Sequence, residues 1–272
     1  MVRNCGQKEK LNVMVLTDLE GISGVETIDA VIPSGTDKYF DSCEKLVDDT
    51  NAAVSALFDA GAEKVYVLDG HGAGTNFPEG RLDKRATQIN IAGMTEAIKD
   101  VCCIVLVGMH AMAGTRTAFL DHTQNSSKIH RYYYNGKRIG ELSQIGFFAG
   151  HYGVPIVAAT GDDAACREAE AFVPGIVTAE VKKAVKRNLA ECLPLSEARA
   201  RIYEAAKLGF EKRGEIAPME ANLPLTVEIE FNRADYADDA LENNPSLERV
   251  DEFFVRSVKE RVEGYLDVLI LY

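Results

Sequence analysis

Ligand-type side chains stand at the ends of three apolar runs in this chain. They are Asp18 and Glu20 after the first run, His71 after the second and His110 after the third. Carboxylate and imidazole groups together form a normal ligand set for Zn²⁺ and other first-row divalent metals. Two carboxylates side by side would repel each other unless a cation lay between them. The residue types and their positions therefore indicate a metal site.

Glu141 could complete this set. It follows Gly140 at the expected start of a helix, where a carboxylate is also favourable for the helix dipole alone. A fifth ligand would suit a site that holds two divalent ions about 3.5–4 Å apart, which is the usual plan of two-metal hydrolases. Such a pair would polarise an amide carbonyl and stabilise the negative charge that its oxygen gains during hydrolysis.

The remaining polar candidates have simpler structural explanations. His122 lies in a polar loop beyond His110 and could be a base, a nucleophile or a surface residue. Asp69 could orient an imidazole or serve only the turn after its strand. Asp162 and Asp163 could cap the helix that follows them or support the site. His130 and His151 are expected to be structural or surface residues.

Strands must bring these residues together. Residues 12–17, 64–68, 103–107 and 154–159 are short apolar runs bounded by turn residues, as buried strands are. Helical spacing over about 38–60 joins the first two runs into a right-handed βαβ unit. The carboxyl ends of parallel strands meet at one edge of an open sheet, where ligands bind. We therefore predict an α/β fold with a mainly parallel sheet flanked by helices.

The sequence pattern of the expected strands changes after residue 195, where apolar and polar residues alternate and no longer form fully apolar runs. We expect a metal-binding catalytic domain over residues 1–195 and a smaller α+β part over 196–272 that shapes the substrate pocket and oligomer contacts. The other expected elements are a hairpin over 132–139 with an Asn-Gly turn, an alternating strand over 225–231, and helices over 140–152, 164–171, 179–191, 196–212 and 247–262.

Length and composition limit the classes of function. The 272 residues are 46% hydrophobic, enough for one large domain or for one domain and a smaller one. A formal net charge of −12 disfavours nucleic acid and anionic membranes as partners. No apolar run approaches the roughly 20 residues of a membrane-spanning helix, and the polar start shows no signal peptide. We expect a cytoplasmic protein whose six cysteines are buried thiols.

The segment Thr17-Asp18-Leu19-Glu20-Gly21-Ile22-Ser23-Gly24 resembles the opening signature of the zinc-dependent D-aminopeptidase (DppA-type) family of metallopeptidases. Further pieces follow in the family's order: Asp69-Gly70-His71, Gly108-Met109-His110-Ala111, the loop residue His122, Ile139-Gly140-Glu141-Leu142, Val154-Pro155-Ile156 and Gly161-Asp162-Asp163. The resemblance covers residues 12–190 clearly and the remainder weakly. Several separate pieces in the same order make it more specific than any single motif.

The resemblance implies a function and a role for each site residue. The family's ligands for two zinc ions per subunit match Asp18, Glu20, His71, His110 and Glu141. His122 matches the family's catalytic histidine, described as a nucleophile, although Asp-His-Thr stands here where the family has Ser-His-Ser. The resemblance also implies a cytoplasmic homo-oligomer, often a decameric ring, that releases N-terminal D-residues from short peptides.

Three other functions are open at this point. An amidase of the same fold could act on a non-peptide amide. A haloacid-dehalogenase-like phosphatase would use the segment Asp18-Leu19-Glu20-Gly21-Ile22, but that family has Asp in place of Glu20, and His71 and His110 would have no role. A non-enzymatic metal-binding protein is disfavoured because all five ligand-type residues are intact. We expect a metallohydrolase that cuts amide bonds; its preference for D-residues rests on the resemblance alone.

Overall fold

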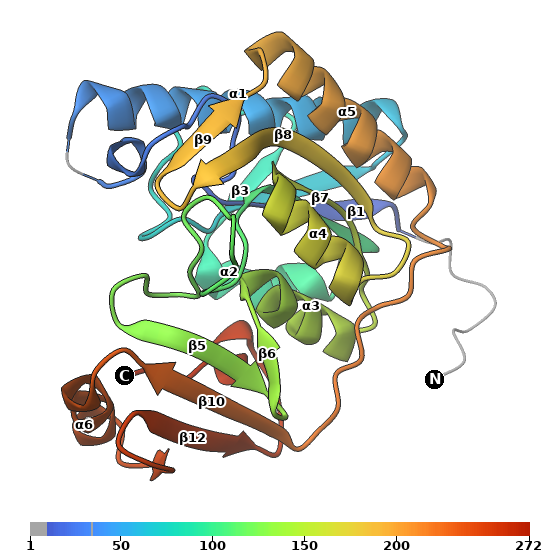
Figure 1. Ribbon diagram of the computed structural model, residues 1–272. Helices are drawn as coiled ribbons and strands as arrows, with labels where there is room; N and C mark the ends of the chain where they lie inside the picture. The colour runs from blue at the N-terminus through green and yellow to red at the C-terminus, as the bar shows by residue number, and fades with distance from the viewer. Residues whose placement is uncertain (1–9, 34) are drawn as a thin grey trace.

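Two β-sheets form the framework of the protein in the computed structural model, which describes residues 10–33 and 35–272 (Figure 1). The larger sheet has the strand order β3 (Thr87–Ile89), β2 (Lys64–Asp69), β1 (Asn12–Thr17), β4 (Cys103–Met109), β7 (Ile156–Asp162), β8 (Val177–Lys186) and β9 (Leu189–Cys192). All of its neighbouring strands are parallel except β8 and β9. The smaller, antiparallel sheet has the order β11 (Glu248–Arg249), β12 (Phe254–Lys259), β10 (Leu225–Phe231), β5 (Ile129–Tyr134) and β6 (Lys137–Ile139).

Helices cover both faces of the larger sheet. The helices α1 (Asp37–Asp59) and α5 (Leu195–Glu211) pack together on one face, and α2 (Ile91–Ile98), α3 (Glu141–His151) and α4 (Asp163–Phe172) lie on the other (Figure 1). The smaller sheet carries α6 (Ala234–Asn243), and two 3₁₀ helices, η1 (Ile28–Ala30) and η2 (Tyr265–Val268), complete the chain. A mainly parallel sheet flanked by helices, with a smaller antiparallel sheet beside it, confirms the predicted fold class.

Burial on both faces explains why the strands of the larger sheet are apolar runs. Every residue of β1 and of β4 is buried. In a parallel sheet that is covered on both sides, successive side chains pack against helices on alternate faces, so few positions are left for polar residues. The strands predicted over 12–17, 64–68, 103–107 and 154–159 are confirmed, with the last observed slightly later, as β7.

The strand order places β1 and β4 at a topological switch point. From β1 the chain proceeds to β2 on one side, whereas β4 and β7 extend the sheet on the other. Ligands of open α/β sheets bind outside the carboxyl ends of the strands at such a point. The two strand ends approach closely, because the Asp18 amide donates to Val107 O at 2.9 Å and the Gly21 amide donates to Gly108 O at 2.8 Å.

Two predicted helices are wrong. Residues 179–191 form β8 and the start of β9, and residues 247–262 form β11 and β12. The first segment is rich in Ala, Glu and Lys, which favour a helix, but pairing with β7 overrides this local preference. The second segment pairs along β10, where Val255 lies opposite Ile229 and is buried. Helix α6 was not predicted.

Residue 195, the expected boundary between two parts of the chain, is the first residue of α5. This helix packs against α1 and the larger sheet. The antiparallel sheet combines β5 and β6 from before residue 195 with β10, β11 and β12 from after it. Between the two sheets lies α3 (Figure 1), and its Phe147 packs edge-on against Tyr134 of β5 with 5.4 Å between ring centroids. The two sheets are therefore interleaved along the sequence.

In the part of the chain that the structure describes, no helix has the length and apolar character needed to cross a bilayer. Cys43, Cys103 and Cys166 are buried, as expected for the cysteines, whereas Cys102 and Cys192 are partly exposed, and Cys5 lies outside the described residues.

The close approach of β1 and β4 makes Gly108 a sensitive position. Its φ is +80°, and an added Cβ would overlap the carbonyl oxygen of Asp18. Gly136, in the β5–β6 turn, has a similar φ of +75° but open space around it. We expect Gly136→Ala to lower the free energy of unfolding by about 1–2 kcal/mol from backbone strain alone. Overlap added to the same strain should raise the cost of Gly108→Ala above about 3 kcal/mol. Urea denaturation of both variants measures the difference, and equal losses would show that the close approach is not required.

Candidate metal centre

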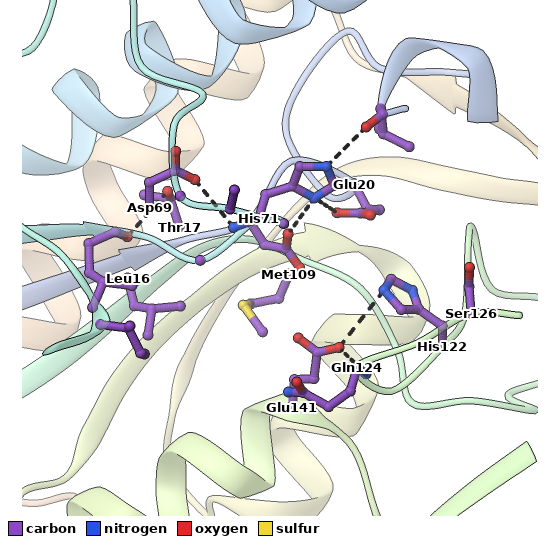
Figure 2. Close-up of a pocket in the computed structure, with 18 of the residues that line it drawn as sticks. Leu16, Thr17, Glu20, Asp69, His71, Met109, His122, Gln124, Ser126 and Glu141 are labelled. Atoms are coloured by element: carbon purple, nitrogen blue, oxygen red, sulfur yellow. Dashed lines mark hydrogen bonds and ion pairs between the residues drawn. The ribbon is translucent and has the colours of Figure 1, made fainter. Parts of the chain in front are cut away.

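Five of the six predicted site residues line one cavity at the switch point, among them Glu20, His71, His122 and Glu141 (Figure 2). The sixth, His110, lies against Asp18 and Glu141. The carboxylate of Asp18 has one oxygen toward each of two histidines: Oδ1 lies 3.2 Å from His71 Nδ1, and Oδ2 lies 3.2 Å from His110 Nε2. Glu20 Oε2 lies 2.9 Å from His71 Nδ1, and Glu141 Oε1 lies 3.6 Å from His110 Nε2. Asp18 is thus the central group, with Glu20 and His71 on one side and His110 and Glu141 on the other.

His71 follows β2 and is held at both ring nitrogens. Its Nε2 lies 2.9 Å from the Val31 carbonyl oxygen, so this nitrogen donates its proton there and Nδ1 faces the carboxylates. Burial alone would lower the pKa of His71. The hydrogen bonds and charges of Asp18 and Glu20 outweigh burial and raise this pKa to about 11. The imidazole is therefore protonated at neutral pH when no ion occupies the space between these groups.

His110 follows β4 and is buried, with its side chain 1% exposed. Its Nδ1 lies 3.1 Å from Ala111 O, which fixes this nitrogen as the backbone-facing donor. Its Nε2 faces Asp18 and Glu141, yet within the described residues it is a buried polar atom without a hydrogen-bond partner. Burial lowers the pKa of His110, but the two carboxylates raise it well above its usual value.

The carboxylates show the complementary shifts. Burial would raise the pKa of Asp18, yet His110 and His71 bring this pKa well below its usual value. The pKa of Glu141 is lowered in the same way, mainly by His110. Glu141 is the first residue of α3, where free backbone N–H groups favour negative charge, and its Oε1 also accepts the Gln124 amide at 2.7 Å. Both carboxylates are therefore ionised and ready to bind a cation.

His122 lies beside this cluster in an irregular loop, as predicted for residues 111–128. Its ring stacks on that of His110 with 3.8 Å between centroids and 12° between planes. Its Nδ1 lies 2.8 Å from Leu120 O, and its Nε2 faces Glu141 Oε1 at 3.8 Å (Figure 2). The backbone on either side is left-handed, with φ of 52° at Leu120 and 64° at Gln124. Strained backbone of this kind is typical of functional loops.

The turn between β8 and β9 holds the loop that carries His122. Arg187 Nε donates to Asp121 Oδ1 at 3.1 Å, and Arg187 Nη2 donates to Asp121 O at 3.2 Å. In return, the Leu120 amide donates to Arg187 O at 2.6 Å. The other carboxylate oxygen of Asp121 accepts the Gly114 amide at 2.6 Å. These four bonds stabilise the left-handed loop geometry that aims the His122 ring.

Two supporting residues were missed from the sequence. Asn76 is buried and donates from Nδ2 to His71 O at 2.8 Å and to both carboxylate oxygens of Asp69 at 3.0 Å. The fully buried Lys182 donates from Nζ to the carbonyls of Glu20 and Val25, both at 2.7 Å, and burial lowers its pKa to about 8. Asn76 follows a glycine-rich turn that looks like an ordinary loop, and Lys182 falls in the segment wrongly predicted as a helix.

The other polar candidates have structural roles. Asp69 accepts the backbone amides of His71 and Asn76 and does not contact an imidazole. Asp162 caps α4 by accepting the Ala165 amide at 2.8 Å, and it also accepts the Phe119 amide. This confirms the helix-capping alternative. His130 and His151 are exposed, as expected.

The donor set fits a transition metal. Two groups of three residues have ligand atoms within 4.8 Å of one another and share His110: one is Asp18, Glu20 and His110, and the other is His110, His122 and Glu141. Mixed carboxylate and imidazole donors are the usual ligands of zinc. The backbone carbonyls at His71 Nε2 and His110 Nδ1 leave the opposite nitrogen of each ring available, which is how metal-binding histidines are normally oriented.

Comparisons with known proteins identify the family of this chain. A curated relative, the D-aminopeptidase of Bacillus subtilis (strain 168), is 28% identical over 226 residues, which make up 81% of each chain. The solved structure of the Zn-dependent D-aminopeptidase DppA from Bacillus subtilis, a self-compartmentalizing protease, matches with a TM-score of 0.87 and 24% identity. That match covers 94% of this chain and 93% of the other, and it shows the fold. The family model described as D-aminopeptidase (Peptidase_M55) matches residues 11–270, and the chain therefore belongs to this family of peptidases and is an enzyme.

Proposed function

We propose that the protein is a dinuclear zinc aminopeptidase that releases N-terminal D-amino acids from short peptides. The observation that carries this proposal is the central position of Asp18, whose two carboxylate oxygens face the metal-binding nitrogens of two different histidines. A carboxylate that bridges two ions has this arrangement. Membership of the D-aminopeptidase family and the zinc dependence of the structurally similar DppA support the choice of metal and substrate.

The contacts of each proposed ligand indicate which ion it would bind. Glu20 and His71 would hold one ion with Asp18, and His110 and Glu141 would hold the other with Asp18. Five ligands carry three negative charges, which two divalent ions would more than balance, whereas two protonated imidazoles leave one charge uncompensated. Lys182 and Asn76 would keep the ligand-bearing loops in place through the backbone of Glu20 and His71.

The chain's own residues would bind and orient the peptide. Two zinc ions would supply Lewis-acid polarisation of the scissile carbonyl. His122 lies beside the ligand cluster with Nε2 directed toward Glu141, where it would act on the scissile bond as base or nucleophile. We extend the proposal to a cytoplasmic homo-oligomer. We propose a decameric ring for its assembly, because the structurally similar DppA is a self-compartmentalizing protease.

Asp18→Asn tests the bridging role. Loss of the shared ligand should reduce bound zinc from about two ions per chain to well below one. Peptidase activity should fall by more than about 100-fold, since even the loss of a group that only supports a metal ligand costs about 10–100-fold. Asp163→Asn is the control, because Asp163 pairs with Arg167 on the surface of α4. Metal analysis of dialysed protein and hydrolysis of D-Ala p-nitroanilide measure the two effects. Full zinc content in Asp18→Asn would refute the assignment.

His122→Ala separates catalysis from metal binding. We expect zinc content to stay near two ions per chain, while kcat falls by about 10²–10⁴-fold, the usual contribution of a positioned acid or base. His130→Ala is the control, since His130 is exposed on β5. A loss of one zinc ion per chain in His122→Ala would instead make His122 a ligand with His110 and Glu141.

Zinc affinity should depend on pH through His71 and His110. The raised pKa values of both keep them protonated in the metal-free protein at pH 7, so zinc binding must release about two protons per chain. Protonated His71 stabilises the metal-free fold fully below about pH 6.5, and this contribution is lost as pH rises toward 11. The Tm difference between zinc-loaded and metal-free protein should therefore widen from pH 6.5 to 9. Calorimetry in buffers of different ionisation enthalpy counts the protons, and a count near zero would contradict the protonated pair.

A further inference from the structure

Four large aliphatic side chains are exposed around the mouth of one cavity. The cavity has a volume of about 580 Å³ and contains the site. The four residues, which we name the aliphatic rim, are Ile28 (37% exposed), Ile32 (50%), Ile91 (44%) and Leu266 (47%). A single exposed aliphatic residue needs no explanation, but a cluster around a cavity marks a binding surface.

The rim is assembled from separate parts of the chain. Ile28 opens η1, Ile32 lies in the segment after it, Ile91 is the first residue of α2, and Leu266 belongs to η2 near the end of the chain. Three distant regions of sequence therefore contribute to one edge of the cavity. Beneath the rim the wall continues as buried apolar side chains: Val31, Leu120, Tyr265 and Leu269.

The cavity is polar at its inner end and apolar at its mouth. Asp18 and Glu20 at the inner end are buried, whereas every rim residue is more than a third exposed. Among the described residues that line the cavity, Arg187 is the one lysine or arginine, and Asp121 already pairs with it. A charged side chain held against the rim would lose water without gaining a partner.

We propose that the aliphatic rim binds an apolar side chain on the leaving residue of the substrate, the residue that follows the N-terminal one. The inference rests on the proposed aminopeptidase function. The N-terminal amino group and the scissile carbonyl must reach the buried inner end, so the part of the peptide that departs extends toward the mouth. Ile28, Ile32, Ile91 and Leu266 are the side chains it meets there.

The effect should appear as selectivity among otherwise equal substrates. One methylene in an apolar pocket changes kcat/KM by roughly 10-fold or more. The rim is partly open to water, so we expect about a tenfold preference for Leu over Gly as the leaving residue. Asp should be disfavoured relative to Gly. The preference should lie mainly in KM, because the rim contacts substrate and transition state alike.

The test compares D-Ala-Gly, D-Ala-Leu and D-Ala-Asp amides on the zinc-loaded protein. The double variant Ile91→Ser with Leu266→Ser should bring the Leu-to-Gly ratio of kcat/KM close to one. The control is Leu208→Ser, since Leu208 is 40% exposed on α5 and does not line the cavity. This control should keep the full ratio. Because the test compares a ratio of kcat/KM values, a general loss of activity in the double variant does not affect the result.

Each outcome has a distinct meaning. Cleavage of all three amides at equal rates, or an unchanged ratio in the double variant, would overturn the rim proposal and leave the aminopeptidase function standing. No cleavage of any D-Ala amide would overturn both. A second copy of the chain could cover the rim in place of a substrate, and light scattering tests this through the molecular mass of the protein. A drop in molecular mass of the double variant with an unchanged ratio would make the rim a contact between copies.

Discussion

Burial of several carboxylates at one point is the constraint on which this structure depends. Asp18 and Glu20 are buried, and Glu141 approaches His110 from the start of α3. Like charges this close are costly unless positive charge lies among them. Protonated His71 and His110 supply it in the metal-free protein, and divalent ions would supply it more fully. The same charge imbalance that strains the metal-free site is therefore the source of its affinity for metal.

The surrounding structure keeps these carboxylates from moving apart. Backbone hydrogen bonds join the ends of β1 and β4. This close approach requires glycine at positions 21 and 108, where a side chain would overlap the neighbouring backbone. From β8, Lys182 reaches the loop that follows β1 and donates to backbone carbonyls there, including that of Glu20. This lysine thus fixes the backbone that carries Glu20 through carbonyl oxygens and not through carboxylate oxygens.

Much of this site could be predicted because its residues directly follow strands. A strand buried on both faces is recognisable as an apolar run, and the polar residue after it must lie at the sheet edge. Asp18, His71 and His110 were therefore found, and the structure brings them together. Asn76 could not be found in the same way, since it acts through hydrogen bonds to Asp69 and to the His71 backbone, which depend on how the loop returns.

The failed prediction over residues 179–191 shows why local sequence was insufficient. Alanine, glutamate and lysine favour a helix, but β7 offers an open edge whose N–H and C=O groups need partners, and β8 supplies them. Only as a strand does this segment bury Lys182 under Glu20 and turn at Arg187 to hold the His122 loop. A helix there would have removed both supports. The tertiary pairing that overrides local preference is thus what links the far edge of the sheet to the candidate catalytic histidine.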